Sequence, residues 1–135
     1  MELSKALSIS ASGMDVQATR LRVIAENLAN QDTTGSTPGA PAYRRKTIQF
    51  ADHIDRSTGA PLVGVEAIAP DPSQQPLRYD PANPAANAQG YVALPNVNSF
   101  VEIMDMRDAE RTYSANLSVM QATRTMLTRT INMLK

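Results

Sequence analysis

The last third of the sequence, residues 97–135, carries an apolar stripe and contains neither proline nor glycine. Large side chains recur there every seven residues, and others fill the three- and four-residue spacing of helices that pack along a narrow seam. One uninterrupted helix of about 35 residues would be about 50 Å long. Because a chain of 135 residues seldom needs so long a helix for its own core, the stripe predicts contacts with neighbouring subunits. Its members are Ile103, Met106, Tyr113, Leu117, Met120, Leu127, Ile131 and Leu134.

A matching stripe predicts a second long helix over residues 2–30. One seam of this helix is large, and the other consists of alanine at every step. Small side chains let a facing helix approach closely, so we expect this stripe to contact other helices as well. Asn30, Gly35 and Pro38 predict where the helix ends. The stripe comprises Leu7, Ala11, Met14, Ala18, Leu21, Ala25 and Leu28.

The middle of the chain has a different composition, since all nine prolines and five of the six glycines lie between residues 35 and 95. Short strands are predicted at residues 43–50, 62–69 and 91–94, with loops between them. The fold class is therefore mainly α, with the terminal helices packed as an antiparallel coiled-coil-like pair around a small irregular β-rich module. The predicted domains are a helical core of residues 1–30 with 97–135, and a module of residues 31–96.

The overall composition excludes several classes of function. Acidic and basic residues balance at 13 each, so no net charge draws the chain to nucleic acid or to an anionic membrane. No cysteine is present, which excludes disulfides and thiolate metal sites. The sequence shows neither a transmembrane run nor a cleaved signal peptide, so a function outside the cytoplasm would need another export route.

Two local features, a histidine between acids and a basic run, resemble functional sites but have simpler structural explanations. His53 lies between Asp52 and Asp55, but no second histidine exists, and a surface or turn position is the simpler explanation. Residues 44–46 form the strongest basic run. It lacks the interleaved aromatic residues of a nucleic-acid site, so we expect a solvated strand edge or charges that meet acids on a neighbouring segment.

The C-terminal helix begins with the spacing of a capping box, Ser99 followed by Glu102. Its outer positions are rich in threonine, which is a mediocre helix former. We therefore expect the helix ends of the isolated chain to be partly disordered and to become ordered when neighbouring subunits cover the stripes.

Three segments resemble the rod and hook group of bacterial flagellar axial proteins. Residues 9–35 resemble the N-terminal signature of that group, and residues 102–120 its C-terminal signature. Residues 79–98 are similar to the segment typical of a proximal-rod subunit. The residues that carry the resemblance are Asn27, Leu28, Ala29, Asn30, Thr34, Gly35, Tyr43, Arg44, Arg45, Gly90, Tyr91, Pro95, Asn96, Val97, Asn98, Arg111, Tyr113, Ala115 and Asn116.

The resemblance implies a structural subunit of the flagellar basal-body rod, with no catalytic residue, metal or cofactor. It implies export through the flagellar type III apparatus, assembly in the periplasm with other rod proteins and with copies of itself, and no direct membrane insertion. A soluble coiled-coil adaptor, or another axial subunit of the rod or hook, is the alternative. An enzyme is disfavoured because one histidine without convergent acids makes no active site.

Overall fold

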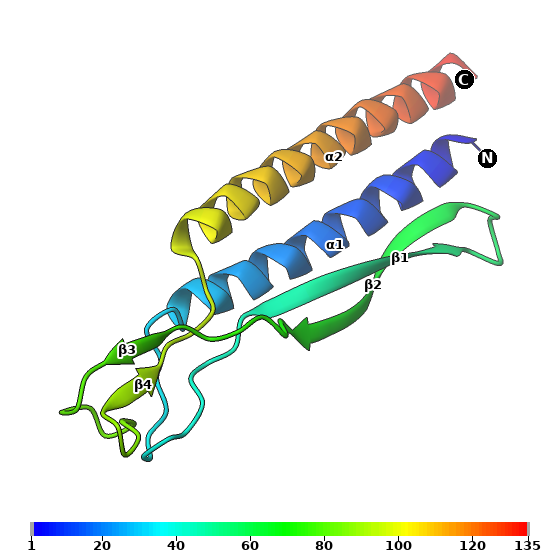
Figure 1. The fold of residues 1–135 in the computed structure, drawn as a ribbon. Helices are drawn as coiled ribbons and strands as arrows, with labels where there is room; N and C mark the ends of the chain where they lie inside the picture. Colours follow the sequence, from blue (N-terminus) through cyan, green and yellow to red (C-terminus); the bar gives the residue numbers. More distant parts are fainter. Residues whose placement is uncertain (1, 135) are drawn as a thin grey trace. The chain divides into compact units, whose positions relative to one another are not determined.

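The computed structural model describes residues 2–134 and contains two long helices and four strands (Figure 1). The strands form two separate two-stranded antiparallel sheets, β1 with β2 and β3 with β4. The prediction of a mainly α fold, with two antiparallel terminal helices and a small β-rich middle, is confirmed. The elements are α1 (Glu2–Ala29), β1 (Lys46–Ile54), β2 (Pro61–Pro70), β3 (Leu77–Tyr79), β4 (Tyr91–Ala93) and α2 (Ser99–Met133).

The chain divides into two compact units, and the long elements contribute to both of them. The described residues among 1–21, 48–67 and 106–135 form the first unit. Residues 22–47 and 68–105 form the second. The predicted division into residues 1–30 with 97–135 and residues 31–96 stays a prediction about which part of the chain assembles.

In the first unit, α1 and α2 run antiparallel along a seam of small and polar side chains. Gly13 of α1 lies against the Asn116 amide, and Arg20 forms an ion pair with Asp108 at 3.1 Å. Ala109 and Thr123 of α2 are buried. The seam therefore allows a close approach of the two helices, and large apolar residues beside it are half-buried.

The hairpin of β1 and β2 packs beside α1 in the first unit. Its turn is closed by the Asp55 N–H, which donates to the carbonyl of Ala60 at 2.9 Å. The backbone N–H of Val63 donates to the Ser12 hydroxyl of α1 at 3.4 Å. A two-stranded ribbon is marginal alone, so this packing on α1 supports it.

In the second unit, β3 and β4 pair with Arg78 opposite Val92 and Tyr79 opposite Tyr91. The apolar core of the second unit is small, and its buried side chains include Val23, Ile24, Ala42, Ala85 and Val92. The rings of Tyr79 and Tyr91 meet edge to face, with centroids 5.4 Å apart. This part of the chain is thus held by few apolar contacts and by many hydrogen bonds.

The strand predictions were partly wrong at their boundaries. The first strand begins at Lys46, because the N–H of Tyr43 bonds the carbonyl of Thr33 and the N–H of Arg45 bonds the Asn96 side chain. It continues to Ile54 and includes His53, which is exposed as expected but lies in a strand and not in a turn. Strand β3 was missed because the prolines before it indicated a loop.

The capping box was also wrong, since Asn98 caps α2. The Asn98 side-chain oxygen accepts from the N–H groups of Phe100 and Val101 at 3.0 and 3.4 Å. Ser99 instead bonds Gln31, and the Glu102 carboxylate is engaged by Arg45. Asparagine is as good an N-cap as serine, so the helix start loses nothing by the exchange.

Within the described part of the chain, neither helix combines the length and the apolar character that crossing a membrane would require.

Candidate functional site: a signature cluster and an apolar heptad face

A polar cluster in the second unit joins residues of four separate segments, and we call Asn27, Tyr43, Arg45, Asn96 and Glu102 the signature cluster. Asn27 lies at its centre and is 1 % exposed. Its side-chain oxygen accepts from the Lys46 N–H at 2.8 Å and from the Tyr43 hydroxyl at 3.0 Å. Its amide nitrogen donates to the carbonyl of Lys46 at 2.9 Å and to Glu102 at 3.2 Å. One asparagine of α1 therefore fixes both the start of β1 and the first turn of α2.

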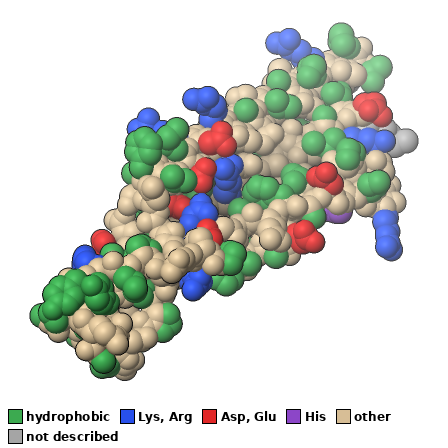
Figure 2. Space-filling view, viewed as in Figure 1, with side chains coloured by type: hydrophobic (Ala, Val, Ile, Leu, Met, Phe, Trp, Pro, Cys, Tyr) green, Lys and Arg blue, Asp and Glu red, His purple; other side chains and the backbone are tan. Residues whose placement is uncertain are grey.

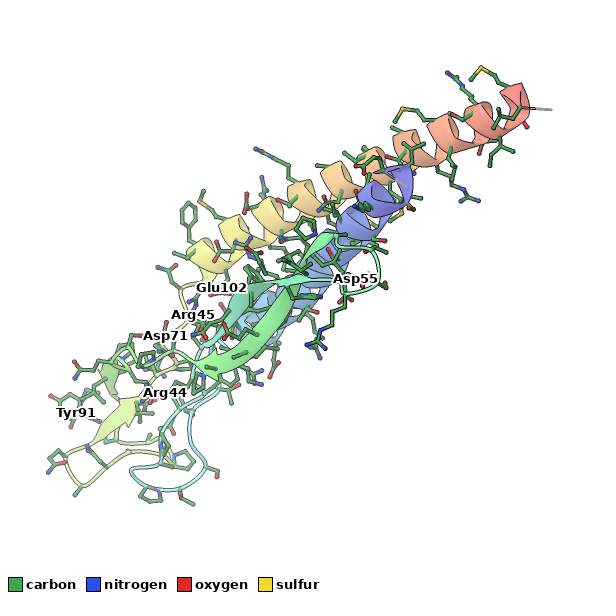
Figure 3. All side chains as sticks on the ribbon, turned by 90° about the vertical axis from the view of Figure 1, so that its right-hand side faces the viewer. Arg44, Arg45, Asp55, Asp71, Tyr91 and Glu102 are labelled. Atoms are coloured by element: carbon green, nitrogen blue, oxygen red, sulfur yellow. The ribbon has the colours of Figure 1, made fainter. Side chains whose placement is uncertain are left out.

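The Glu102 carboxylate is fully buried, and Arg45 neutralises it. The Arg45 Nε donates to Glu102 at 2.5 Å, and other guanidinium nitrogens lie 3.5 Å from Asp71 and 3.6 Å from Asp105. Figure 3 shows the side chains of Arg45, Glu102 and Asp71 close together. A buried carboxylate is strongly unfavourable unless it is paired and hydrogen-bonded, as it is here.

The electrostatics follow from these contacts. Burial lowers the pKa of the Arg45 guanidinium, but its hydrogen bond and attraction to Glu102 outweigh burial and raise the pKa above its ordinary value. Hydrogen bonds from the backbone and hydroxyl of Ser73 lower the pKa of Asp71, and Arg45 adds to this effect. The Lys46 pKa is raised by its hydrogen bond to Glu26. Both arginine and lysine therefore stay charged in their pairs.

Asn96 connects the cluster to the segment after β2. Its side-chain oxygen accepts from the Arg45 N–H at 2.8 Å, and its nitrogen donates to the Ser73 hydroxyl at 2.8 Å. Arg44 donates to the carbonyls of Asp71 and Ser73, each at 3.1 Å. Of the two predictions for the basic run, the one in which its charges meet neighbouring acids is correct for Arg45 and Lys46.

The other signature residues lie in turns or on helices outside the cluster. Gly35 packs against Ala40, where a Cβ would lie 2.6 Å from a neighbouring atom. Gly90 has a positive φ of 81° and lies under the ring of Tyr79. Asn116 meets Gly13 in the first unit, so the N-terminal and C-terminal signatures also touch there. Exposed on the lone chain are Ala29, Arg111 and Ala115, while Leu28, Asn30, Thr34, Val97 and Tyr113 are half-buried and Pro95 is buried.

The contacts of the signature cluster indicate a structural role. The Glu102 carboxylate is paired with Arg45, and the side-chain amide of Asn27 is fully hydrogen-bonded. No group of three side chains able to hold a metal ion occurs within residues 2–134. The cluster thus ties chain segments together, and this role requires both of the long helices.

The predicted heptad stripes lie on one side of the helix pair in the first unit. Gly13 and Arg20 face α2, so Met14 and Leu21, each one residue later, lie about 100° around α1 on one flank. Asn116 faces α1, so Leu117 is turned to a flank of α2. When two helices run antiparallel, the residue that follows a contact position on one helix lies on the same side of the pair as the residue that follows a contact position on the other helix. Met14, Leu21 and Leu117 therefore lie on one side.

We call this side the heptad face; Ser12, on the opposite flank of α1, is where β2 packs. The face is half covered at its centre and open at its edge. Ile131 is 49 % exposed and Leu117 is 39 % exposed. Its half-buried members are Leu7, Met14, Leu21, Met106, Tyr113, Met120 and Leu127, and its exposed ones are Ala11, Ala18, Leu117, Ile131 and Leu134.

In the second unit, Ala25 and Ile103 are exposed and Leu28 is half-buried. The assignment of all these residues to subunit contacts remains a prediction.

Sequence reasoning missed two features of the structure. The burial of Glu102 was hidden because its spacing from Ser99 matched a capping box. A second apolar stripe on α2 was overlooked because alanine occupies part of it. The three- and four-residue spacing from Ala115 through Val119 and Ala122 to Met126 is the signal that could have revealed it.

Comparison with known proteins supports the same interpretation of both ends. Residues 7–37 match the family model described as flagella basal body rod protein, and residues 88–133 match the one described as flagellar basal body rod FlgEFG protein C-terminal. A flagellar basal-body rod protein FlgC of Agrobacterium fabrum is 47 % identical over 133 residues, covering 98 % of this chain and 96 % of that protein.

Two more distant relatives have the same description. The FlgC protein of Salmonella typhimurium is 36 % identical, with 98 % of each chain covered. That of Borreliella burgdorferi is 35 % identical, with 93 % of each chain covered. Such identity over nearly the whole length places the chain among structural components of the basal body that are not enzymes. The chain belongs to the FlgC family of flagellar basal-body rod proteins.

Proposed function

We propose that the chain is a subunit of the proximal rod, and that its terminal helices pack with those of neighbouring subunits into the shaft that transmits torque. The observation that carries this proposal is the heptad face, whose outer members are open on the lone chain. Figure 2 shows apolar side chains gathered at both ends of α2. Covering apolar surface with a neighbouring subunit contributes about 25 cal/mol of favourable free energy per Å² buried.

The requirements of a drive shaft agree with the structure. Torque needs long stiff elements with repeated contacts, and α1 and α2 contain 28 and 35 residues. The signature cluster fixes the helices to the middle module within the second unit, so a load on α2 reaches β1 through Arg45 and Glu102. We propose that residues 1–30 with 97–135 form the assembling part, and that residues 31–96 form the outer module.

The proposed partners are other rod proteins and further copies of this chain. The proposed route is export through the flagellar type III apparatus to the periplasmic part of the basal body. The proposal includes neither nucleic acid nor insertion into a membrane.

The substitution Leu117→Asp tests the proposal. Leu117 is 39 % exposed on the lone chain, so a carboxylate there leaves folding largely intact and harms only a covered interface. We expect loss of motility and of rod assembly, while the chain is still exported. Thr125→Asp, on an exposed position of the same helix, is the matched control and should swim.

Normal swimming of the Leu117→Asp strain would show that the heptad face is not an interface. A density map of the intact basal body tests the location, and finding the chain outside the proximal rod would contradict the proposal. A soluble coiled-coil adaptor would instead remain a small discrete oligomer in sedimentation.

A further inference from the structure

Helix α2 carries a second apolar stripe in the first unit, which we define as Ala115, Val119, Ala122, Met126 and Met133. Its members follow each other at intervals of four, three, four and seven residues, the spacing of a helix-packing seam. All of them are exposed; Val119 is 51 % and Met126 is 50 % exposed. Nothing within the described part of the chain covers this stripe.

The second stripe and the heptad face lie on opposite flanks of α2. Asn116 contacts Gly13 and Thr123 is buried, so this line of α2 faces α1. Ala115 and Ala122 each precede that line by one residue, whereas Leu117 follows it by one. One residue is about 100° of rotation, so the two sets point to opposite sides of the helix pair.

We propose that the second stripe of one copy packs on the heptad face of the next copy, in a heterologous side-by-side contact. This inference rests on the proposed function and names the partner of the heptad face. Two different apolar faces on opposite sides of one chain cannot both be covered by a single two-fold contact. They can both be covered when each copy repeats the same contact with the next, which generates a ring or a helical array.

Shape and charge support this pairing. The second stripe alternates alanine with Val119 and Met126, so large side chains stand between small ones. The heptad face likewise combines Leu7 and Met14 with Ala11 of α1, which suits interlocking of large and small residues. Exposed Glu110 borders the heptad face, and exposed Arg111 borders the second stripe at nearly the same height. Copies aligned side by side would bring these opposite charges together.

The absence of native cysteine makes single-cysteine cross-linking a direct test. Cells would produce two full-length forms of the chain, Val119→Cys and Leu117→Cys, which differ in mass through a small tag. Isolated basal bodies would be treated with a short bis-maleimide. We expect cross-linked dimers that pair one form with the other. Thr125→Cys replaces Val119→Cys in the control, and we expect at least about tenfold less dimer because this position lies outside both faces.

The other outcomes separate this inference from the proposed function. Dimers between two Val119→Cys chains would overturn the heterologous contact in favour of a two-fold one. A Leu117→Cys thiol that is protected from maleimide in isolated basal bodies but forms no dimer with Val119→Cys would overturn this inference and leave the proposed function intact. If the Leu117→Cys thiol stays fully reactive to maleimide in isolated basal bodies, both proposals fail.

The unmodified chain offers a second measurement, should a cysteine form fail to assemble. Hydrogen peroxide transfers one oxygen atom to the methionine sulfur and leaves water, and the rate depends on access to the thioether. We expect oxidation of Met126 to be at least about fivefold slower in isolated basal bodies than in the free chain. An equal rate in both would overturn the second stripe as an interface.

Discussion

The Nε of Arg45 donates to the fully buried Glu102 carboxylate at 2.5 Å, and this pair joins the start of β1 to the first turn of α2. Asn27 of α1 donates to the same carboxylate at 3.2 Å. Asn27 and Glu102, from two of the signature segments, thus share one negative charge with Arg45 in the second unit. In this chain, Asn27, Arg45 and Glu102 therefore hold α1, the start of β1 and α2 together within the second unit.

Glu102→Gln is expected to lower the free energy of unfolding by about 2 kcal/mol. The substitution removes the charge that Arg45 answers and turns an amide nitrogen of the new side chain toward Arg45 or toward the Asn27 donor. The loss is smaller than for an isolated buried pair, because Arg45 keeps Asp71 and Asp105. Urea unfolding followed by tyrosine fluorescence measures it.

Glu110→Gln is the matched control for this prediction, because Glu110 is exposed on the same helix. We expect it to change the free energy of unfolding by less than about 0.5 kcal/mol. Equal stability of the two variants would contradict a structural role for the Glu102 charge.

Gly13→Ala is expected to destabilise the chain by about 1 kcal/mol, although alanine is the better helix former by a similar amount. The new methyl group would lie 2.8 Å from the Asn116 amide nitrogen, so the two helices would have to separate or the amide would have to move. Urea unfolding of the single variants and of Gly13→Ala with Asn116→Ala completes a double-mutant cycle.

In that cycle, Asn116→Ala removes the obstacle, so the added alanine should then stabilise the helix. The sign of the Gly13→Ala effect is therefore expected to reverse between the two backgrounds. A stabilising effect of Gly13→Ala in the unchanged background would show that the seam between α1 and α2 is looser than the structure indicates.

Tyr43→Phe is expected to cost about 1 kcal/mol at neutral pH, because the Tyr43 hydroxyl donates to Asn27 at 3.0 Å. Burial raises the pKa of Tyr43, and the charge of Glu26 adds to the effect. The unfolded chain therefore ionises first, so this stabilisation is present below about pH 10 and declines as the pH rises through the folded pKa. Unfolding measured between neutral and alkaline pH tests this, and the same decline in Tyr43→Phe would rule Tyr43 out as its source.

Periodicity predicted the helices because it depends only on side chains of one segment. Both helices begin and end within two residues of the predicted positions. The strand from residue 62 was also predicted closely, since its apolar run is bounded by prolines. The prolines before residue 77 indicated a loop, but Leu77–Tyr79 forms a strand because it pairs with β4.

The contacts of the signature residues could not be predicted from spacing. Asn27 and Glu102 are 75 positions apart, and the meeting of their side chains depends on the axial register of α1 against α2. In the first unit, the contacts of Gly13 with Asn116 and of Arg20 with Asp108 likewise depend on the helix register. Such fits are properties of packed helices, and one seven-residue repeat is compatible with several registers.

Asp55 supplies a prediction about acid stability, because it closes the β1–β2 turn with its carboxylate. One oxygen accepts from the N–H and hydroxyl of Ser57 at 2.8 and 2.7 Å, and the other from the Thr58 hydroxyl at 2.9 Å. These hydrogen bonds lower the pKa of Asp55 to about 2. Because the folded pKa lies below the unfolded one, the turn is stabilised above about pH 4, and this stabilisation is lost as the pH falls through about 2.

NMR titration of the Asp55 carboxyl carbon should therefore give a midpoint near 2. Asp55→Asn should remove part of the pH dependence of unfolding between about pH 4 and pH 2. Asp52→Asn, on the exposed strand before the turn, serves as the control and should retain that dependence. A midpoint close to the ordinary aspartate value would mean that the hydroxyl bonds of Ser57 and Thr58 do not persist in solution.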